Sequence, residues 1–220
     1  MTVKVGVVVF PGTNCEHDVV EAVDSVGGCG RLLWHKDAGL ADVDAVILPG
    51  GFAHGDYLRT GAMARFSPIM DAVIRFARGG GPVVGICNGF QILTEARLLP
   101  GALYKNRDLK FLCQPTRLRV ASTGSVLTRG LNVGDELDIP INHFEGNYIC
   151  SDRTLAELRE TSSIMFTYRN NPNGATSDIA GISNKTGNVV GLMPHPERAA
   201  HPLLGSTDGA LLLKGLIGGG

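Results

Sequence analysis

Buried-strand and helix patterns alternate through the first 99 residues of the chain, and this alternation limits the fold more than any other feature. Residues 3–10 ("VKVGVVVF") and 82–86 ("PVVGI") are almost continuously apolar and rich in β-branched residues, as expected of strands buried on both faces. Residues 15–27 and 67–81 place apolar residues at helical intervals and end in glycines. The pattern predicts an α/β fold with an open, mostly parallel sheet and helices on both of its faces.

The second half of the chain has a different character, because short segments there alternate apolar with polar residues and are joined by turn residues. This pattern predicts antiparallel strands, added to the same sheet or along its edge, with a hairpin loop at 184–188 ("NKTGN") and a terminal helix at 207–217. No linker, low-complexity tract or internal repeat interrupts the sequence, so we predict a single domain over residues 1–220. The predicted elements of the first half are strands at 3–10, 30–35, 44–51 and 82–86 and helices at 15–27, 67–81 and 88–99.

Charge and cysteine content narrow the classes of partner and the compartment. A formal net charge of -1 gives no electrostatic basis for binding nucleic acid or an anionic membrane. The five cysteines form no CxxC pair, and an odd number is a poor disulfide framework. No apolar run approaches the ~20 residues that span a bilayer, and the N-terminus has the pattern of a strand, not of a signal peptide. We therefore expect a reduced, soluble, cytoplasmic protein.

A cysteine between two glycines follows the strand predicted at 82–86. Gly85 and Gly89 flank Cys87 at two residues on either side, which suits a sharp strand-to-helix turn that exposes the cysteine side chain. Such a turn places the sulfur at a helix N-terminus, where the helix dipole favours a thiolate. A buried core cysteine is the alternative, and it is the commoner fate of a lone cysteine. The glycine spacing favours a nucleophile.

The sequence "MPHPERA" supplies a candidate base and its orienting acid. His195 lies between two prolines, and Glu197 is two residues further on. On an extended segment the side chains of residues i and i+2 point the same way, so Glu197 can reach the far nitrogen of His195. Together with Cys87, this pair predicts a Cys-His-acid triad, although a surface turn with an exposed ion pair is the alternative reading of the motif alone.

Backbone amides near the predicted nucleophile can form an oxyanion hole. Gly50 and Gly51 close the apolar run at 44–51, and the amide of Gly51 is one candidate donor. The amide of Asn88, at the start of a helix, is the second. The glycine-rich stretch 49–56 has few side chains to fix its peptide planes. We therefore expect the Gly50–Gly51 peptide to rotate at little cost in the isolated chain.

No metal or nucleotide site is predicted within this chain. The sequence contains no HExxH, CxxC or GxxxxGK[ST] motif. His195, Glu197 and His201 could in principle share a metal ion, but the intervening prolines and the cysteine turn disfavour this reading. Cys15 follows the first strand and is therefore expected near the same sheet edge as Cys87, with packing as its first role.

These motifs carry a resemblance to a known family. Residues 85–91 ("GICNGFQ") with 195–197 ("HPE") resemble the class I (triad) glutamine amidotransferases, and longer segments resemble the glutaminase subunits of phosphoribosylformylglycinamidine synthase. The resemblance runs from the first strand to the last helix, and its long motifs are more specific than a triad. The segments that carry the closer resemblance are residues 10–18, 49–65, 143–148, 171–199 and 203–209.

The resemblance implies a set of roles and partners. Cys87 would attack the carboxamide of L-glutamine, His195 would shuttle protons and Glu197 would orient it, while Gly51 and Asn88 would supply the oxyanion amides. Gln91 would help to hold the substrate. Ammonia would pass to a separate ATP-dependent synthetase subunit, in a complex with a small accessory subunit, during de novo purine synthesis. No cofactor is implied in this chain, and ATP and Mg²⁺ are expected on the synthetase.

Two other functions stay open at this stage. A stand-alone cysteine hydrolase or chaperone-like member of the related elbow-cysteine families is the first, but these proteins often carry a histidine directly after the cysteine, where this chain has Asn88. A non-catalytic regulatory subunit is the second, and the complete set of Cys87, His195 and Glu197 argues against it.

Overall fold

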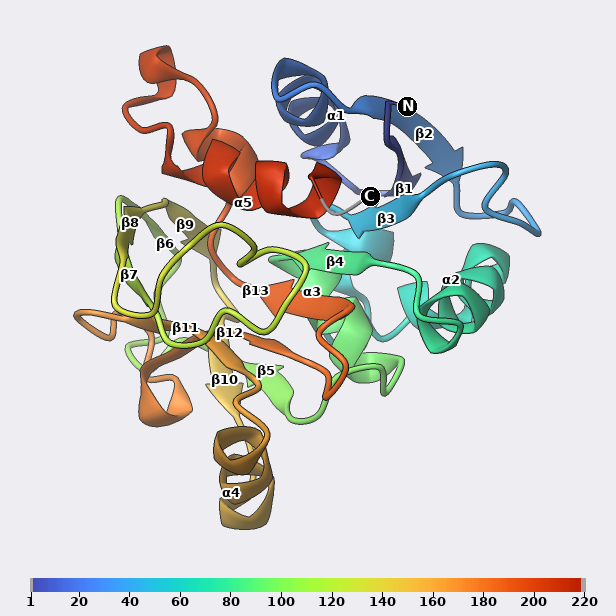
Figure 1. Ribbon diagram of the computed structural model, residues 1–220. Coiled ribbons are helices and arrows are strands. Elements are labelled where there is room, and N and C mark those ends of the chain that lie inside the picture. The colour runs from blue at the N-terminus through green and yellow to red at the C-terminus, as the bar shows by residue number, and fades with distance from the viewer. Residues whose placement is uncertain (1, 219–220) are drawn as a thin grey trace.

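The computed structural model describes residues 2–218, in which nine strands form one mixed sheet (Figure 1). Five neighbouring strands are parallel, and the remaining four continue the sheet in antiparallel fashion. The predicted architecture of a mostly parallel sheet extended by antiparallel strands is therefore confirmed. In sheet order, the strands are β2 (Cys29–Trp34), β1 (Lys4–Val9), β3 (Ala45–Leu48), β4 (Val83–Ile86), β13 (Val189–Leu192), β12 (Ile179–Ser183), β11 (Ile164–Tyr168), β7 (Arg117–Val120) and β8 (Glu136–Asp138).

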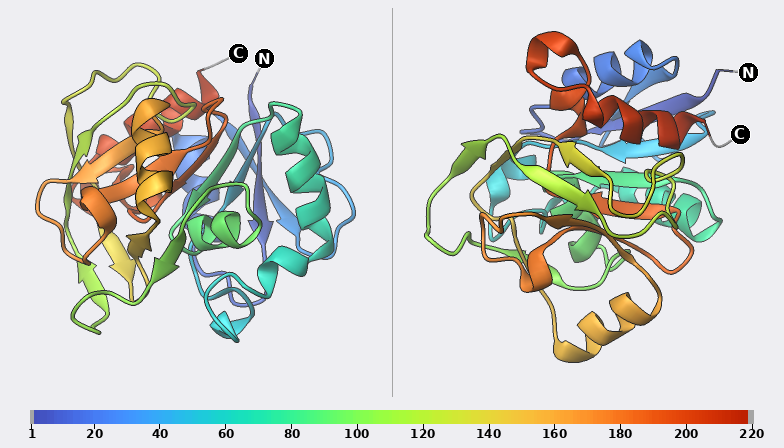
Figure 2. Two further views of the ribbon diagram at one scale, coloured as in Figure 1. Left: turned by 90° about the horizontal axis from the view of Figure 1, so that it is seen from below. Right: turned by 60° about the vertical axis from the view of Figure 1, so that its left-hand side comes forward.

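Helices cover both faces of the parallel strands. Helices α1 and α5 lie on one face, and α2 and α3 lie on the other, as both Figure 1 and Figure 2 show. Helix α4, which the sequence patterns do not predict, projects away from the sheet below β10 and β5 in Figure 1. The helices are α1 (Glu16–Ser25), α2 (Pro68–Arg78), α3 (Asn88–Glu95), α4 (Asp152–Glu160) and α5 (Asp208–Ile217).

The strand order determines where a ligand-binding site is expected. The chain leaves β1 towards β2 in one direction, whereas it leaves β3 towards β4 in the opposite direction. Ligands of open α/β sheets bind beyond the carboxyl ends of the strands at such a switch in direction. Strands β3, β4 and β13 are neighbours and parallel, so their carboxyl ends bring together three segments that are far apart in sequence.

The antiparallel half differs in detail from the prediction. The hairpin at 184–188 does join β12 to β13, as predicted. Parts of the segments 110–122 and 137–149, however, leave the main sheet and form two separate two-stranded ladders. One ladder pairs β5 (Ala102–Tyr104) with β10 (Asn147–Ile149), and the other pairs β6 (Leu112–Gln114) with β9 (Ile141–His143).

Buried hydrophobic side chains from both halves of the sequence belong to one contiguous core. Val5 and Val7 of β1, Ile86 of β4 and Phe166 of β11 are fully buried members of this cluster. Helix α3 packs on the sheet from within this core, which fixes the cysteine turn at its N-terminus. Among residues 2–218, every helix is too short or too polar to cross a lipid bilayer.

Candidate active site

Cys87 occupies a sharp turn between β4 and α3. Its φ of 50° and ψ of -104° are strained values for a residue with a side chain, and its amide donates to Leu192 O at 2.8 Å. Gly89 lets α3 approach the sheet, because a Cβ at this position would lie 1.9 Å from Leu48 O. Strain of this kind persists only where the surrounding structure enforces it, and it concentrates at functional sites. The turn predicted around Cys87 is therefore present and tightly held. The expectation that it exposes the cysteine side chain is wrong, because Cys87 is only 5% exposed and packs against the hydrophobic core.

His195 and Glu197 form a buried pair at the carboxyl end of β13. His195 Nδ1 lies 2.6 Å from Glu197 Oε1, and the two residues are 1% and 3% exposed. The contact was predicted from an extended segment, and that reason is wrong, since residues Pro196–Ala199 form a 3-10 turn, η4. The turn brings the carboxylate back to the ring within two residues, so the predicted pair forms through different local geometry.

Electrostatics favour a proton on this histidine. Burial lowers the pKa of His195, but the negative charge of Glu197 and the nearby thiol of Cys87 oppose this effect and raise the pKa well above its usual value. A buried acid that raises the proton affinity of an imidazole is the arrangement that a proton-shuttling histidine requires.

The Gly50–Gly51 peptide is held more firmly than its sequence suggests. Gly50 O accepts hydrogen bonds from the amides of both Asn14 and Cys15 at 3.2 Å, and Phe52 N donates to Gly12 O at 2.8 Å. Rotating the peptide would break the two bonds to Gly50 O, each worth about 1 kcal/mol. The expectation of a loose peptide is therefore wrong. The plane of the Gly50–Gly51 peptide is fixed by the backbone amides of the segment after β1, without help from a side chain.

Asn88 and Gln91 join the turn of Cys87 to the loops around it. Asn88 Oδ1 accepts from Ala53 N at 3.0 Å, and Asn88 Nδ2 donates to Gln91 Oε1 at 2.8 Å. Gln91 Nε2 in turn donates to Glu145 O at 2.6 Å. The Asn88 amide is also the first helical N–H of α3, a position that has no acceptor within its own helix. Gln91 borders the cavity with both polar atoms of its side-chain amide engaged by the protein, and its contact with substrate stays a prediction.

The strand ends that carry Gly51, Cys87 and His195 form the first wall of the site. Residues 142–146 form the second wall, which faces the turn of Cys87. His143 is 3% exposed, and within the part of the chain that the structure describes neither ring nitrogen has a hydrogen-bond partner. Burial, together with the nearby His195, lowers the pKa of His143 to about 3, so its ring is neutral. The backbone of the wall is clamped by two buried asparagines: Asn106 Nδ2 donates to His143 O at 2.9 Å, and Asn173 Nδ2 donates to Gly146 O at 2.8 Å.

Two acidic residues close the rim between the walls. Burial and, secondly, the charge of Glu145 raise the pKa of Asp56 to about 6. Thr60 Oγ1 donates to Glu145 Oε2 at 3.1 Å, and Asn88 Nδ2 donates to Asp56 Oδ1 at 3.3 Å. The rim of the site is thus acidic, and it is tied to both walls.

Together these residues enclose a cavity of about 250 Å³. Both Cys87 and His195 border it, so the candidate nucleophile and base share one space. Its lining comprises Asn14, Cys15, Gly51, Phe52, Asp56, Thr60, Cys87, Gln91, Asn142, His143, Phe144, Glu145, His195 and Arg198.

Sequence reasoning missed several of these lining residues. Asp56, Thr60, His143 and Glu145 fall in segments that carried the resemblance, but no individual role was assigned to them. Polar residues within the glycine-rich stretch after β3 were the available signal. Cys15 was expected to pack, and it is buried, but its sulfur also borders the cavity and accepts from Arg198 Nη2 at 3.3 Å.

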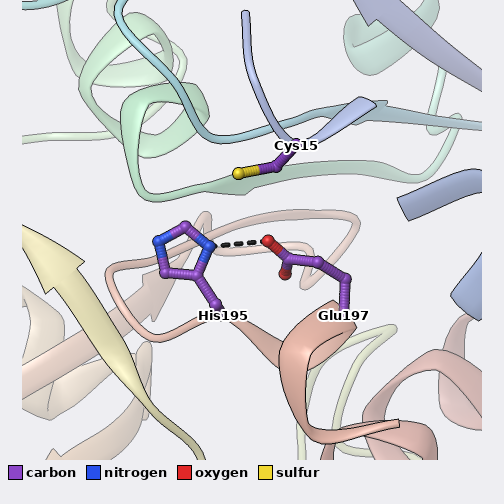
Figure 3. A group of neighbouring side chains, drawn as sticks. All are labelled: Cys15, His195 and Glu197. Carbon is purple, nitrogen blue, oxygen red and sulfur yellow. Dashed lines mark hydrogen bonds and ion pairs between the residues drawn. The ribbon is translucent and has the colours of Figure 1, made fainter. Parts of the chain in front are cut away.

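His201 does not join the triad residues. It is exposed, and its Nδ1 accepts from Leu203 N at 3.3 Å. The structure instead brings Cys15 next to His195 and Glu197, as Figure 3 shows.

Comparison with known proteins identifies the family of this chain. The family model of the CobB/CobQ-like glutamine amidotransferase domain matches residues 2–208. Two relatives are PurQ chains of phosphoribosylformylglycinamidine synthase: that of Koribacter versatilis is 51% identical, over 98% of this chain and 97% of its own, and that of Rubrobacter xylanophilus is 53% identical, over 98% of both.

Solved structures agree with the sequence comparison. A chain in the structure of PurLQS from Thermotoga maritima is 38% identical, with a TM-score of 0.91 and 99% of both chains covered. A glutamine amidotransferase from Thermotoga maritima, 18% identical with a TM-score of 0.59 over 97% of this chain and 90% of its own, shares the fold. The chain belongs to the PurQ family of glutamine amidotransferases.

Proposed function

We propose that this chain hydrolyses L-glutamine to glutamate and ammonia through a thioester on Cys87, and delivers the ammonia to a synthetase subunit. The observation that carries the proposal is the shared cavity, which is bordered by a strained cysteine at a helix N-terminus and by a histidine with a buried acid partner. Among the alternatives, a non-catalytic subunit would have no need to hold a cysteine in a strained conformation.

In the first half of the reaction, the thiol proton of Cys87 passes to His195, whose raised pKa favours holding it, and the sulfur attacks the carboxamide carbon. His195 then gives this proton to the leaving nitrogen, so ammonia departs and a glutamyl thioester forms. Glu197, at 2.6 Å, holds the ring and stabilises its positive charge without taking up the proton.

In the second half, His195 removes a proton from a water molecule that attacks the thioester carbon. The carbon–sulfur bond breaks, the proton returns to the sulfur, and glutamate is released. The amides of Gly51 and Asn88 are our candidates for the donors to the oxyanion in both halves. One such donor contributes about 3 kcal/mol, or two orders of magnitude in rate.

The relatives supply the destination of the ammonia. Since the matched relatives are PurQ subunits and one matched structure is a PurLQS assembly, we propose a synthetase and a small accessory subunit as partners in phosphoribosylformylglycinamidine synthesis. ATP and Mg²⁺ would bind the synthetase, and the reaction would take place in the cytoplasm during de novo purine synthesis. We further propose that residues 1–220 act as one domain, which the single hydrophobic core supports.

The test measures glutamate and ammonia release from glutamine by the full chain, alone and with the synthetase and accessory subunits. Cys87→Ala should abolish glutamine use while the assembled complex still makes product from added ammonium salt. Cys113→Ala, which removes an exposed thiol, is the matched control and should retain the rate.

Each alternative gives a different result. Hydrolysis of other amides or esters but not of glutamine would identify a stand-alone hydrolase. No hydrolysis with or without the partners would identify a non-catalytic subunit. Glutamine use by Cys87→Ala would overturn the role of the cysteine turn.

A further inference from the structure

A second thiol lies against the buried histidine–glutamate pair. One sulfur, one ring nitrogen and one carboxylate oxygen from Cys15, His195 and Glu197 all lie within 4.8 Å of one another. Figure 3 shows Cys15 reaching from the segment after β1, while His195 and Glu197 come from the segment after β13. We propose that this cluster is an inhibitory binding site for a thiophilic divalent cation, with Zn²⁺ as the best-fitting ion.

The set of donor atoms matches the coordination chemistry of such an ion. Zinc binds cysteine sulfur, histidine nitrogen and carboxylate oxygen at about 2.0–2.3 Å, which puts ligand atoms of a tetrahedral site about 3.5 Å apart. Ligand atoms as far apart as 4.8 Å would have to approach by about 1.3 Å, and the hydrogen bond of 2.6 Å between His195 Nδ1 and Glu197 Oε1 would have to open. A water molecule from the cavity can take the fourth position, since Cys15 and His195 both border that space.

One oxygen of the Glu197 carboxylate is bonded to His195 Nδ1, and the other has no partner in the part of the chain that the structure describes. Glu197 Oε2 is buried and, within residues 2–218, accepts no hydrogen bond, although Glu197 is 3% exposed. An unpaired buried carboxylate oxygen is unfavourable, and a cation bound to this carboxylate would offset part of that cost. This orphaned oxygen is independent of the cysteine, and it distinguishes the cluster from a lone buried thiol.

The surrounding charges allow a cation to bind. A bound Cys15 thiolate and the Glu197 carboxylate together balance a charge of +2. Arg198 opposes the cation, but its Nε lies 3.8 Å from Asp18 Oδ2, which offsets its charge. The hydrogen bond from Arg198 to the Cys15 sulfur can persist, since metal-bound thiolates keep such outer partners.

Access is available from two sides. Cys15 and His195 border the cavity of about 250 Å³, and Glu197 borders a separate groove of about 520 Å³ between α1 and the segment 197–204. Arg198, whose side chain is 36% exposed, borders both spaces.

Metal binding at this cluster would stop the proton shuttle while leaving Cys87 outside the ligand set. The ion would take a lone pair of His195 and an oxygen of Glu197, and the displaced ring or thiol protons would pass to solvent. The inhibition would therefore be reversed by a chelator and would need no oxidation of either thiol.

Co²⁺ is the probe that reports the ligand set, because a cobalt–thiolate bond gives a charge-transfer absorption band. We would titrate Co²⁺, and then Zn²⁺ in competition, into the full-length wild-type chain, Cys15→Ser and Cys87→Ser. Cys15→Ser should lose the band and bind Zn²⁺ more than about 100-fold more weakly, since loss of an outer partner alone costs 10- to 100-fold. Cys87→Ser should keep both the band and the affinity.

The inhibition is tested separately, with each variant compared with its own metal-free rate. Zn²⁺ should inhibit glutamine hydrolysis by the wild type and have a correspondingly weaker effect on Cys15→Ser. A band that persists in Cys15→Ser, or that is lost in Cys87→Ser, would overturn the proposed site. Since the absorption band needs no catalysis, this result is independent of whether the chain hydrolyses glutamine.

Discussion

The two walls of the cavity are built in different ways. The first wall consists of strand ends: Gly51 follows β3, Cys87 follows β4 and His195 follows β13, and backbone hydrogen bonds hold each of them. The second wall, residues 142–146, is the end of a short ladder, and the side chains of Asn106 and Asn173 clamp it. The first wall carries the groups proposed to make and break bonds, whereas the second offers groups that contact a ligand. The difference indicates that reactive groups are placed on the rigid sheet and recognition on a wall that depends on a few buried amides.

The largest effects are expected on the first wall. His195→Ala should lower kcat for glutamine by about 10⁴-fold or more, since removing the shuttle nearly equals removing the nucleophile. Glu197→Gln should have a smaller effect, because the residue orients the ring and does not transfer a proton. Steady-state kinetics with glutamate detection would measure both. Equal and negligible losses would reduce this pair to a structural contact.

The second wall should respond through substrate binding. Asn106 bonds the carbonyls of His143 and Lys110 and the amide of Gly146, so Asn106→Ala should raise KM for glutamine about tenfold with less change in kcat. It should also lower the free energy of unfolding by about 2 kcal/mol. Asn132→Ala, at an exposed position, is the control. A loss confined to kcat would remove the distinction between the two walls.

Acid should destabilise the protein through the second wall. Because the pKa of folded His143 is about 3 and the usual value is 6.5, the unfolded chain binds the extra proton between these values. Stability is therefore lost as the pH falls below about 6.5, by about 1.4 kcal/mol for each pH unit at most. Urea unfolding of wild type and His143→Phe at pH 7, 6 and 5 would test this. The variant should show a shallower decline, and parallel curves would contradict the assignment.

Asp56 on the rim should give a smaller effect of opposite sign. Its folded pKa of about 6 lies above the usual value near 3.8, so the folded state holds the proton more tightly. Its contribution to stability is present at low pH and is lost as the pH rises from about 4 to about 6. Since the carboxyl is partly exposed, we expect less than about 1 kcal/mol. Comparing Asp56→Asn with wild type across this range should show the variant gaining relative stability, and an unchanged difference would exclude the shift.

Sequence patterns could predict the first wall because it follows from topology. Parallel strands end at one edge of a sheet, so Gly51, Cys87 and His195 had to converge once the strands were recognised. The local conformations predicted for two of these segments were wrong. The His195–Glu197 contact arises from a turn and not from an extended segment, and the Gly50–Gly51 peptide is fixed by partners after β1.

The second wall could not be predicted from sequence patterns. Its clamp joins Asn106 to His143 and Asn173 to Gly146 across separations of 37 and 27 residues. A polar residue in a loop gives no indication of which distant carbonyl it will meet. The same limit applies to Cys15, whose contact with Arg198 spans 183 residues.

The doubly accepting carbonyl of Gly50 has a consequence for hydrogen exchange. The amides of Asn14 and Cys15 both donate to this one oxygen, and the plane of the same peptide sets the direction of the Gly51 N–H. An opening that rotates this peptide frees both donors and redirects the candidate oxyanion donor at the same time. The exchange rates of two amides in a segment without any proposed catalytic group would thus report, before any substrate is bound, how often the site is ready for the reaction.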